Sequence, residues 1–482
     1  MTEIANDAPE NEQDPIQTGH GNGDTTPPEA DIQTCLVTGG AGFLGSHLAR
    51  ALLERGYRVQ VLDLAAPDFT HERLRFSQGD LRCYEDVLEA VTGADTVFHT
   101  ASIVTLLSYY SKEIRQESYD INVGGTENVI RACRESGVAR LIYTSSNNVI
   151  FDGHDIELAD ESLPYPDKYV DLYSETKSLA EREVLAANGP EGLLTCAIRP
   201  SGIYGPGEKL FLPRVIARCD DGLLLIRMGD EDAKSEYSYI DNLVHGHLLA
   251  AHKLVPGSPA PGQAYFINDG ECLNNFEFFR PVLEDLGLPF PERLVPAFPL
   301  KIVAAVGEIA HWLLKTPRPI FTVIEVLKSS VSNPCSIEKA RRDLGYEPLV
   351  SWAEGIERCL PSCRETLRTR EKVDRPHPAW WVSIIIGMIA LGLLAHHPPT
   401  WAFWSQHVIG IIPHWVYQVG LWVAVLTHVH KGLKAVRLAE RAGLHRTSTA
   451  WGWQTLILGF ASMKLLLPRI ERVTREREQQ AG

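Results

Sequence analysis

The sequence predicts an α/β protein in which a doubly wound parallel sheet is followed by a smaller mixed lobe and by membrane-associated helices. Short apolar strand patterns alternate with helical patterns between residues 33 and 150, as the crossover connections of a parallel sheet require. A glycine-rich turn, TGGAGFLG at 38–45, joins the first strand to the first helix. Beyond Pro376 the composition becomes strongly apolar, which predicts a separate C-terminal region.

The elements of the sheet are predicted from apolar runs bounded by turn residues. Helices are expected at 45–55 and 123–136, and each ends before a glycine suited to a left-handed C-cap, Gly56 or Gly137. A further helix is expected at 172–187. The strands are expected at 35–38, 58–62, 73–77, 96–100, 140–145 and 195–199.

The glycine-rich turn is typical of a dinucleotide site. Gly39, Gly42 and Gly45 follow a strand and open a helix, so the backbone can approach a pyrophosphate at the helix N-terminus. The structural alternative is a flexible glycine turn without a ligand. Phe43 and Leu44 complete the turn and are included among the expected cofactor-binding residues.

Two acidic positions extend this predicted site and identify its ligand. Asp63 follows the second strand, where a carboxylate can accept hydrogen bonds from both ribose hydroxyls and would repel a 2′-phosphate. The sequence therefore favours NAD over NADP and a Rossmann fold for the core. Asp80 and Leu81 follow the third strand, where the adenine ring is expected, although Asp80 can equally serve as a helix N-cap.

Tyr173 and Lys177 form an i, i+4 pair on one face of the helix at 172–187. We expect Tyr173 to transfer the proton that accompanies a hydride, and Lys177 to lower the pKa of the phenol and to hold the nicotinamide ribose. Both residues should therefore also contact the cofactor. Ser146 ends a strand and should hydrogen-bond the substrate oxygen at the same point. The structural alternative is an exposed helix face that carries an unrelated tyrosine and lysine.

Composition sets the boundaries of the regions and excludes some classes of protein. The net charge of −15 argues against a nucleic-acid partner, and nine cysteines without a CxxC pair predict no metal site. Eight carboxylates and no Lys or Arg occur in residues 1–33. The expected regions are a disordered acidic tail at 1–32, a Rossmann core with the catalytic helix at 33–200, a substrate-binding lobe at 201–372 from which some strands return to the core, membrane-associated helices at 378–468 and a charged tail at 469–482.

Three apolar segments, 380–395, 408–427 and 450–467, predict attachment to a membrane. Each approaches the roughly 20 residues that span a bilayer, and tryptophans lie near their ends. The alternative is a soluble helical hairpin. A helix at 300–314 has a broad apolar face that can rest on lipid or on the core, and the core is favoured.

The distribution of basic residues predicts the orientation of this membrane region. Basic residues outnumber acidic ones in the expected loop 428–448, which favours the cytosolic side and places the catalytic domain there. A third full span would export the basic tail around 469–477. The number of spans is therefore left open.

The chain resembles the extended short-chain dehydrogenases/reductases, and within them the 3β-hydroxysteroid dehydrogenase/isomerase group. The resemblance covers about residues 33–365, and the stretch 274–281 is similar to the membrane-tailed 42E branch. The motifs that carry it are TGGAGFLG at 38–45, GDL at 79–81, NVGGT at 122–126, YTSS at 143–146, the run 173–181 and RPSGIYGPG at 199–207.

The resemblance implies a role for each matched position. Tyr173 would be the catalytic acid/base, Lys177 its activator and ribose ligand, and Ser146 the substrate-orienting hydroxyl. Pro200 would lie near the nicotinamide, and related enzymes imply a homodimer paired through the helix that bears Tyr173. One departure from the family pattern is the Asn147–Asn148 pair after the serines, which predicts a more polar pocket.

The leading functional prediction is an NAD-dependent oxidation of a secondary alcohol, the 3β-hydroxyl of a steroid or sterol, beside a membrane. A second enzymatic prediction adds Δ5-to-Δ4 isomerisation or loss of a C4 carboxylate to the oxidation. A prediction from another class is a membrane adaptor that binds NAD without turnover. A sugar-nucleotide epimerase is also considered, although a soluble substrate does not account for the apolar C-terminal region.

Overall fold

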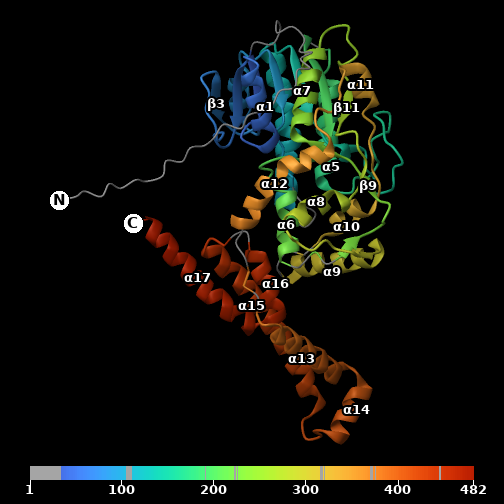
Figure 1. Ribbon diagram of the computed structural model, residues 1–482, viewed down its shortest axis with the longest axis vertical. Coiled ribbons are helices and arrows are strands. Elements are labelled where there is room, and N and C mark those ends of the chain that lie inside the picture. The colour runs from blue at the N-terminus through green and yellow to red at the C-terminus, as the bar shows by residue number, and fades with distance from the viewer. Residues whose placement is uncertain are drawn as a thin grey trace, which may run out of the picture.

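The computed structural model shows a three-layered α/β head and a set of C-terminal helices that extend from it (Figure 1). Residues 1–33, which include the predicted acidic tail at 1–32, lie outside the described residues. The structure describes residues 34–104, 111–189, 192–221, 224, 226–314, 319, 321–369, 373–374, 376–444 and 447–481.

The centre of the head is a seven-stranded parallel sheet in the order β11-β6-β5-β4-β1-β2-β3. The predicted doubly wound sheet is therefore confirmed, with strand ends within about two residues of those expected from the sequence. The strands are β1 (Thr34–Thr38), β2 (Arg58–Asp63), β3 (Leu74–Gln78), β4 (Thr96–His99), β5 (Arg140–Thr144), β6 (Leu194–Pro200) and β11 (Ala264–Ile267).

Helices cover both faces of this sheet and bury its apolar side chains in two separate core clusters. Helices α1 and α7 pack on one face, and α2, α4 and α5 pack on the other. A π-helical turn precedes α4, so the predicted helix at 123–136 begins in an irregular segment. The bounds are α1 (Phe43–Glu54), α2 (Tyr84–Val91), α3 (Lys112–Tyr119), η2 (Asp120–Gly124), α4 (Gly125–Glu135), η3 (Asn147–Ile150), α5 (Leu172–Ala186) and α7 (Ile240–Lys253).

The strand order places a switch point next to β1. Strand β1 pairs with β2 on one side and with β4 on the other, so the chain winds away from β1 in both directions. In open parallel sheets the crevice at such a point, beyond the carboxyl ends of the strands, is where ligands bind. The glycine-rich turn lies at this edge because it directly follows β1.

A smaller lobe follows β6 and contains short paired strands and helices, as the sequence predicted. Strand β7 pairs with β10, β9 with β12, and β8 with β13. The bounds are β7 (Gly202–Tyr204), α6 (Leu212–Asp220), β8 (Ile226–Met228), β9 (Lys234–Ser235), β10 (Tyr237–Tyr239), β12 (Leu273–Asn274), η5 (Glu277–Phe279), α8 (Arg280–Asp285), β13 (Arg293–Val295), α9 (Ala297–Leu314), α10 (Val323–Ser330), α11 (Glu338–Leu344) and α12 (Trp352–Thr369).

Helix α9 presents a broad apolar face to the outside, so the favoured prediction that this face rests on the core is wrong. Leu300 and Ala304 are buried against the lobe, but the opposite face is between 47% and 76% exposed. Figure 1 shows α9 at the end of the head from which the C-terminal helices extend. The exposed side chains are Phe298, Ile302, Val303, Val306, Ile309, Trp312 and Leu313.

The C-terminal region is helical, but only one of its described helices, Pro378–His396, is both long and apolar enough to cross a membrane. The predictions of membrane spans at 408–427 and 450–467 are wrong. The helix expected from 408 starts at His414 and runs on through most of the expected loop 428–448. The bounds are α13 (Pro378–His396), α14 (Pro398–His407), α15 (His414–Arg441), α16 (Ser448–Leu458) and α17 (Phe460–Ala481).

The segment predicted as a third span, 450–467, is broken at Gly459. This glycine has φ +53° and ψ −111°, and it separates α16 from α17. Trp451 and Leu466 on either side of the break are buried against α15 in one small core. The two pieces therefore fold back on a helix of the same chain instead of forming a straight span.

Candidate active site

The glycine-rich turn forms a closely packed backbone cradle between β1 and α1. Gly39 has φ +70°, a left-handed conformation that favours glycine. A Cβ on Gly45 would lie 2.2 Å from the Gly39 carbonyl oxygen, and one on Gly40 would lie 2.6 Å from the Val61 side chain. Gly42 caps α1 with no side chain of its own, so the helix N-terminus remains accessible to an anion. Phe43 and Leu44 begin the helix, as expected.

Asp63 ends β2 and faces the glycine-rich turn. One carboxylate oxygen accepts the Ala41 N–H at 3.0 Å, and the other accepts the Leu64 N–H at 2.7 Å. The side chain is partly exposed and keeps free lone pairs. The structure therefore brings the predicted ribose-binding carboxylate to the predicted pyrophosphate turn.

Asp80 follows β3, but its carboxylate is bound by a neighbouring arginine. Arg82 donates from Nε to both carboxylate oxygens at 3.0 Å and lowers the pKa of Asp80. The predicted alternative, a helix N-cap, is wrong because α2 is capped at Cys83. Leu81 is buried and packs against the backbone of Gly125, so it fixes the approach of α4 to this loop.

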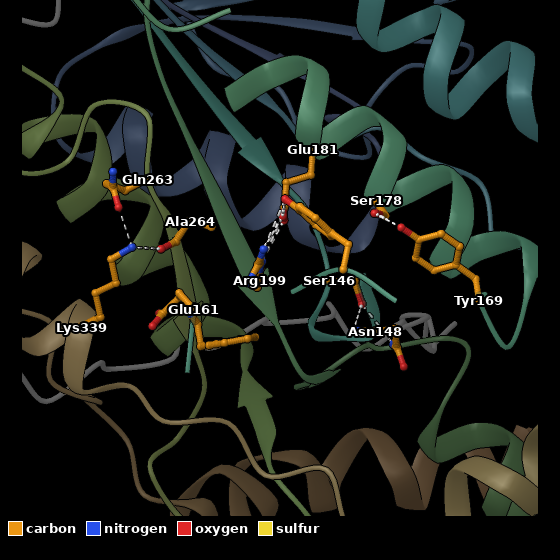
Figure 2. Close-up of polar contacts among 12 residues, drawn as sticks. Ser146, Asn148, Glu161, Tyr169, Ser178, Glu181, Arg199, Gln263, Ala264 and Lys339 are labelled. Carbon is orange, nitrogen blue, oxygen red and sulfur yellow. Dashed lines mark hydrogen bonds and ion pairs between the residues drawn. The ribbon is translucent and has the colours of Figure 1, made fainter. Parts of the chain in front are cut away.

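Tyr173 and Ser146 meet at the carboxyl edge of the sheet. Asp171 caps α5 by accepting the Ser174 N–H at 2.6 Å, and this fixes Tyr173 in the first turn of the helix. The Ser146 side chain lies near the Tyr173 hydroxyl and acts to lower its pKa. Ser146 also accepts the backbone and side-chain N–H groups of Asn148 at 3.2 and 3.1 Å (Figure 2). The structure therefore brings the two predicted catalytic hydroxyls near one another.

Lys177 lies one turn further along α5 and is only 2% exposed. Its ammonium donates to the Thr144 carbonyl at 2.5 Å and lies 4.2 Å from the centre of the Tyr143 ring. Burial lowers the pKa of Lys177 to about 7, although the Glu181 carboxylate acts in the opposite direction. The lysine is therefore held inside the helix–sheet interface, below the tyrosine hydroxyl.

The predicted lowering of the tyrosine pKa by this lysine does not occur in this structure. Burial and the negative charge of Asp171 raise the pKa of Tyr173 to about 12, and only the nearby Ser146 side chain acts to lower it. The physical reason is the direction of the Lys177 side chain, which points to the Thr144 carbonyl. The phenol is consequently protonated at neutral pH.

The buried pair Arg199–Glu181 holds α5 against β6 and was not predicted as part of the site. Arg199 and Glu181 are 3% and 0% exposed, and Arg199 donates to both carboxylate oxygens (Figure 2). Glu181 follows Tyr173 and Lys177 at the same four-residue spacing, which is the signal that could have found it. Tyr165 donates to this carboxylate at 2.6 Å. Tyr165 therefore helps to hold Glu181 in place and is not itself a site residue.

Two further predicted positions connect neighbouring elements. Asn122 lies in the π-helical turn, where its amide binds the Ile103 backbone and donates to Thr176 on α5 at 3.0 Å. Pro200 is buried at the end of β6, beside Ile267 of β11. Asn122 thus has a positioning role, since it ties the loop after β4 to the helix that carries Tyr173.

A cavity of about 710 Å³ opens beside Tyr173 and extends into the smaller lobe. Asn147 and Asn148 line it, as the sequence predicted, but the Asn148 amide is already bonded to Ser146. Much of the remaining wall is apolar and comes from α6, α9 and α10 and the strands between them. The apolar lining includes Val170, Phe211, Val215, Met228, Phe276, Phe279, Ala305, Ile309, Val323 and Leu327.

Comparison with known proteins identifies the family. Residues 36–300 match the 3-beta hydroxysteroid dehydrogenase/isomerase family. Over 335 residues the chain is 46% identical to the 3 beta-hydroxysteroid dehydrogenase/Delta 5-->4-isomerase of Mycobacterium tuberculosis, which covers 69% of this chain and 90% of that protein. The chain belongs to the 3-beta hydroxysteroid dehydrogenase/isomerase family. The predicted resemblance and the predicted enzyme class, a dehydrogenase acting on CH–OH groups, are confirmed.

Other relatives agree with this family and with the fold. The chain is 44% identical over 331 residues to short-chain dehydrogenase/reductase family 42E member 1 of Bos taurus, covering 65% of this chain and 84% of that protein. The solved structure of MoeE5 with UDP-glucuronic acid and NAD has a TM-score of 0.55 at 24% identity and covers 69% of this chain and all of that one; this likeness shows the fold alone. Residues 379–468 match the Transmembrane protein 254 family.

Proposed function

We propose that the protein is an NAD-dependent oxidoreductase that oxidises the 3β-hydroxyl of a steroid or sterol to the ketone. The observation that carries this proposal is the proximity of Ser146 to the Tyr173 hydroxyl, with Tyr173 in the wall of a large apolar cavity. A volume of about 710 Å³ is within the range of small-molecule sites and admits a rigid apolar ring system. The names of relatives that are called 3-beta-hydroxysteroid dehydrogenases support the same substrate class.

The charges in the cavity favour a steroid over a sugar nucleotide. Among the described residues that line it, the basic side chains are Arg218 and Lys328, and both are already paired. Arg218 lies 3.2 Å from the Glu325 carboxylate, and Lys328 lies 2.6 Å from that of Asp171. A nucleoside diphosphate needs uncommitted positive charge or N–H groups, whereas a steroid requires neither. This supports the dehydrogenase proposal over a sugar-nucleotide epimerase.

The residues at the switch point fit NAD as the cofactor. The glycine cradle at 39–45 would hold the pyrophosphate, and Asp63 would accept from the adenosine ribose. Lys177 would hold the nicotinamide ribose, with Pro200 beside the nicotinamide ring. When bound, NAD supplies the hydride acceptor and, in its oxidised form, a positive charge on the nicotinamide.

In the proposed reaction the protein binds the alcohol and moves its proton. The steroid occupies the cavity with its 3β-hydroxyl against Tyr173 and Ser146, which fix the oxygen by hydrogen bonds. Tyr173, as the phenolate, takes the hydroxyl proton while the carbinol C–H bond breaks with loss of a hydride. Ser146 donates to the oxygen as it becomes a carbonyl. Because the Tyr173 pKa is high in this structure, oxidation should accelerate as the pH rises.

The test of this proposal is a substrate panel with the full-length protein in vesicles. We expect NAD reduction with 3β-hydroxysteroids or 3β-hydroxysterols, and none with their 3α epimers or with UDP-glucose. Tight NAD binding without turnover of any lipid alcohol would favour the membrane adaptor. Turnover of the nucleotide sugar would favour an epimerase.

Asp63 gives a separate prediction about cofactor choice. Replacing Asp63 with Asn should raise the KM for NAD about tenfold or more, because a hydrogen bond to a charged group contributes roughly 1.5–3 kcal/mol. The ratio of kcat/KM for NAD to that for NADP should fall because the repulsion of a 2′-phosphate is lost. The matched control is Asp68→Asn, since Asp68 is an exposed acid in the loop that follows β2, paired with Arg50. An unchanged cofactor ratio in D63N would contradict the role.

We further propose that the catalytic head lies beside a membrane on its cytosolic side. The apolar helix α13 and the match to a transmembrane family support membrane association. The exposed face of α9 supports contact of the head with lipid, because several large apolar side chains are adjacent there. Ala305, Glu308 and Ile309 of the same helix line the cavity, and Ile309 is also 49% exposed, so α9 would lie between the lipid and the substrate.

This proposal predicts that α9 is accessible to quenchers in the lipid. A fluorophore placed on Val303→Cys in the full chain should be quenched severalfold more by brominated lipids than one on Leu349→Cys. The two sites are matched, at 59% and 61% exposure. Both variants would carry Cys272→Ser, because Cys272 is an exposed thiol. Equal quenching at the two sites would show that α9 does not touch the bilayer.

A further inference from the structure

One face of the long helix α15 changes from apolar to basic along its length. Consecutive side chains of this face are three or four residues apart, so they lie along one side of the helix. The apolar members, between 37% and 64% exposed, are Val416, Val419, Val423 and Leu426. The basic members, all exposed and here called the basic stripe, are His430, Lys434, Arg437 and Arg441.

The basic stripe is turned away from the packed side of α15. Gly432, Ala435 and Ala439 are buried on the other side of the helix, where α15 packs against α16. None of the ion pairs among the described residues includes a side chain of the stripe. The only acid in the sequence between residues 376 and 470 is Glu440, which lies on a neighbouring face, about 100° from Arg441. The stripe therefore concentrates uncompensated positive charge in a chain whose net charge is −15.

The stripe begins at the level where the apolar helix α13 begins. The two helices run antiparallel, because His414 and Gln418 near the start of α15 bond the carbonyls of Leu394 and Ala395 near the end of α13. Since each helix rises about 1.5 Å per residue, the first residue of α13 lies level with residues 430–435 of α15. The whole of α15 is too polar to count as a membrane span, but the apolar part of its face lies beside α13. The basic stripe lies beyond the end of α13.

We infer that the basic stripe binds the anionic headgroups of phospholipids in the leaflet that faces the catalytic head. This rests on the proposed membrane association of α13 and is independent of the proposed oxidation. The change from apolar to basic along one face matches the boundary between acyl chains and phosphate groups. Lysine and arginine bind phosphate through charge-assisted hydrogen bonds, and their aliphatic stems can lie along the acyl chains.

Lipid fits the stripe better than the other source of negative charge in the chain, the segment 1–33 with its eight carboxylates. The stripe continues an exposed apolar face, which the acyl chains of the same lipids would cover. A segment rich in carboxylates would neutralise the charge but leave the apolar part of the face in water. Headgroup binding would also fix the depth of α13 in the bilayer, on the side of the head where α9 lies (Figure 1).

The experiment measures which lipid the full-length protein holds at its surface. The protein is reconstituted in phosphatidylcholine vesicles that contain a trace of spin-labelled phosphatidylglycerol or spin-labelled phosphatidylcholine, and electron paramagnetic resonance gives the lipid that the protein restricts. At low salt the association constant should be about fivefold higher for phosphatidylglycerol, the factor that one basic side chain contributes at an anionic surface. The ratio should approach one at about 1 M salt, where charges are screened beyond roughly 3 Å.

The stripe variant removes the three permanent charges of the face and should bring the low-salt ratio close to one. Its substitutions are Lys434→Gln, Arg437→Gln and Arg441→Gln. Glutamine is nearly as good a helix former as lysine and arginine, so α15 should be retained.

A matched control removes the same number of charges from the head and should keep the wild-type ratio. Its positions are exposed, belong to no ion pair among the described residues, and lie at the edge of the sheet opposite the glycine-rich turn, where α1 and α7 end and β2 begins. The substitutions are Arg55→Gln, Arg58→Gln and Lys253→Gln.

Flotation with pure phosphatidylcholine vesicles tests the membrane association separately, and neither measurement needs turnover of a substrate. A wild-type ratio near one at low salt, or an unchanged ratio in the stripe variant, would overturn the inference if the protein floats, and would leave the proposed oxidation and membrane association intact. Protein that does not float would overturn the membrane association and the inference with it. A preference for phosphatidylglycerol that appears only after the carboxylates of segment 1–33 are replaced by amides would assign the stripe to that segment and overturn the inference.

Discussion

Replacing Tyr173 with Phe is expected to lower kcat for alcohol oxidation by about 10²–10⁴-fold while leaving NAD binding in place. The ring remains in the cavity wall, so substrate packing is conserved, but the oxygen that takes the hydroxyl proton is gone. Ser146 cannot substitute for it, because its oxygen already accepts two N–H groups from Asn148. The measurement is initial-rate NADH formation with the steroid that the substrate panel identifies.

The chain offers a matched control for this variant. Tyr169 precedes the same helix, and its hydroxyl bonds Ser178 at 2.5 Å. Tyr169→Phe removes the same atom from a tyrosine four residues away, and it should oxidise at close to the wild-type rate. Comparable losses in Y169F and Y173F would indicate a general effect on folding. Undiminished turnover in Y173F would reject the proposed mechanism.

The cofactor turn could be predicted from the sequence because its requirements are local. Gly39 and Gly45 occupy positions where a Cβ would collide with the backbone, so the glycine pattern is dictated by the turn itself. Asp63 was found by its distance along the chain from that turn, since one helix, α1, and one strand, β2, connect the two. Tyr173 was found by helical spacing together with these signals.

Side-chain directions could not be predicted in the same way. The i, i+4 spacing places Tyr173 and Lys177 on one helix face, but it does not tell which way a flexible four-carbon chain turns. Lys177 bonds the Thr144 carbonyl, a partner 33 residues away in the sequence. Glu236 lies immediately before β10, is 5% exposed and lines the cavity. No signal in the sequence pointed to it either, because a single acid before a short strand is usually exposed. Only the folded lobe shows that it is enclosed in the cavity.

The membrane region shows a related limit of sequence patterns. A hydropathy average over 450–467 does not detect a change of chain direction at Gly459, and the predicted third span therefore failed. The prediction of one apolar helix at 380–395 succeeded because every position in that run is uncharged. For α9 the apolar face was recognised, but its partner depends on the packing of the lobe and could not be read from the helix alone.

Arg199→Met is expected to destabilise the head by about 3–5 kcal/mol, the largest stability change we expect from a substitution outside the reacting groups. The substitution would leave the Glu181 carboxylate, 0% exposed, without its positive partner at the interface of α5 and β6. The same carboxylate favours the charged form of Lys177, so disturbance of the pair should also impair the site. The free energy of unfolding is measured by chemical denaturation of the full chain in detergent, followed by tryptophan fluorescence.

The interpretation of this variant depends on two comparisons. Arg341→Met removes an arginine that pairs with Glu338 and Glu347 at the surface. This substitution should lower the free energy of unfolding by at most about 1 kcal/mol, because exposed ion pairs contribute little to stability. The double variant Arg199→Met with Glu181→Gln should be more stable than R199M, since the unpaired buried charge is removed. If R199M were as stable as R341M, the pair would not hold α5 in place, and the position of Tyr173 would have to depend on the Asp171 cap and on Asn122 instead.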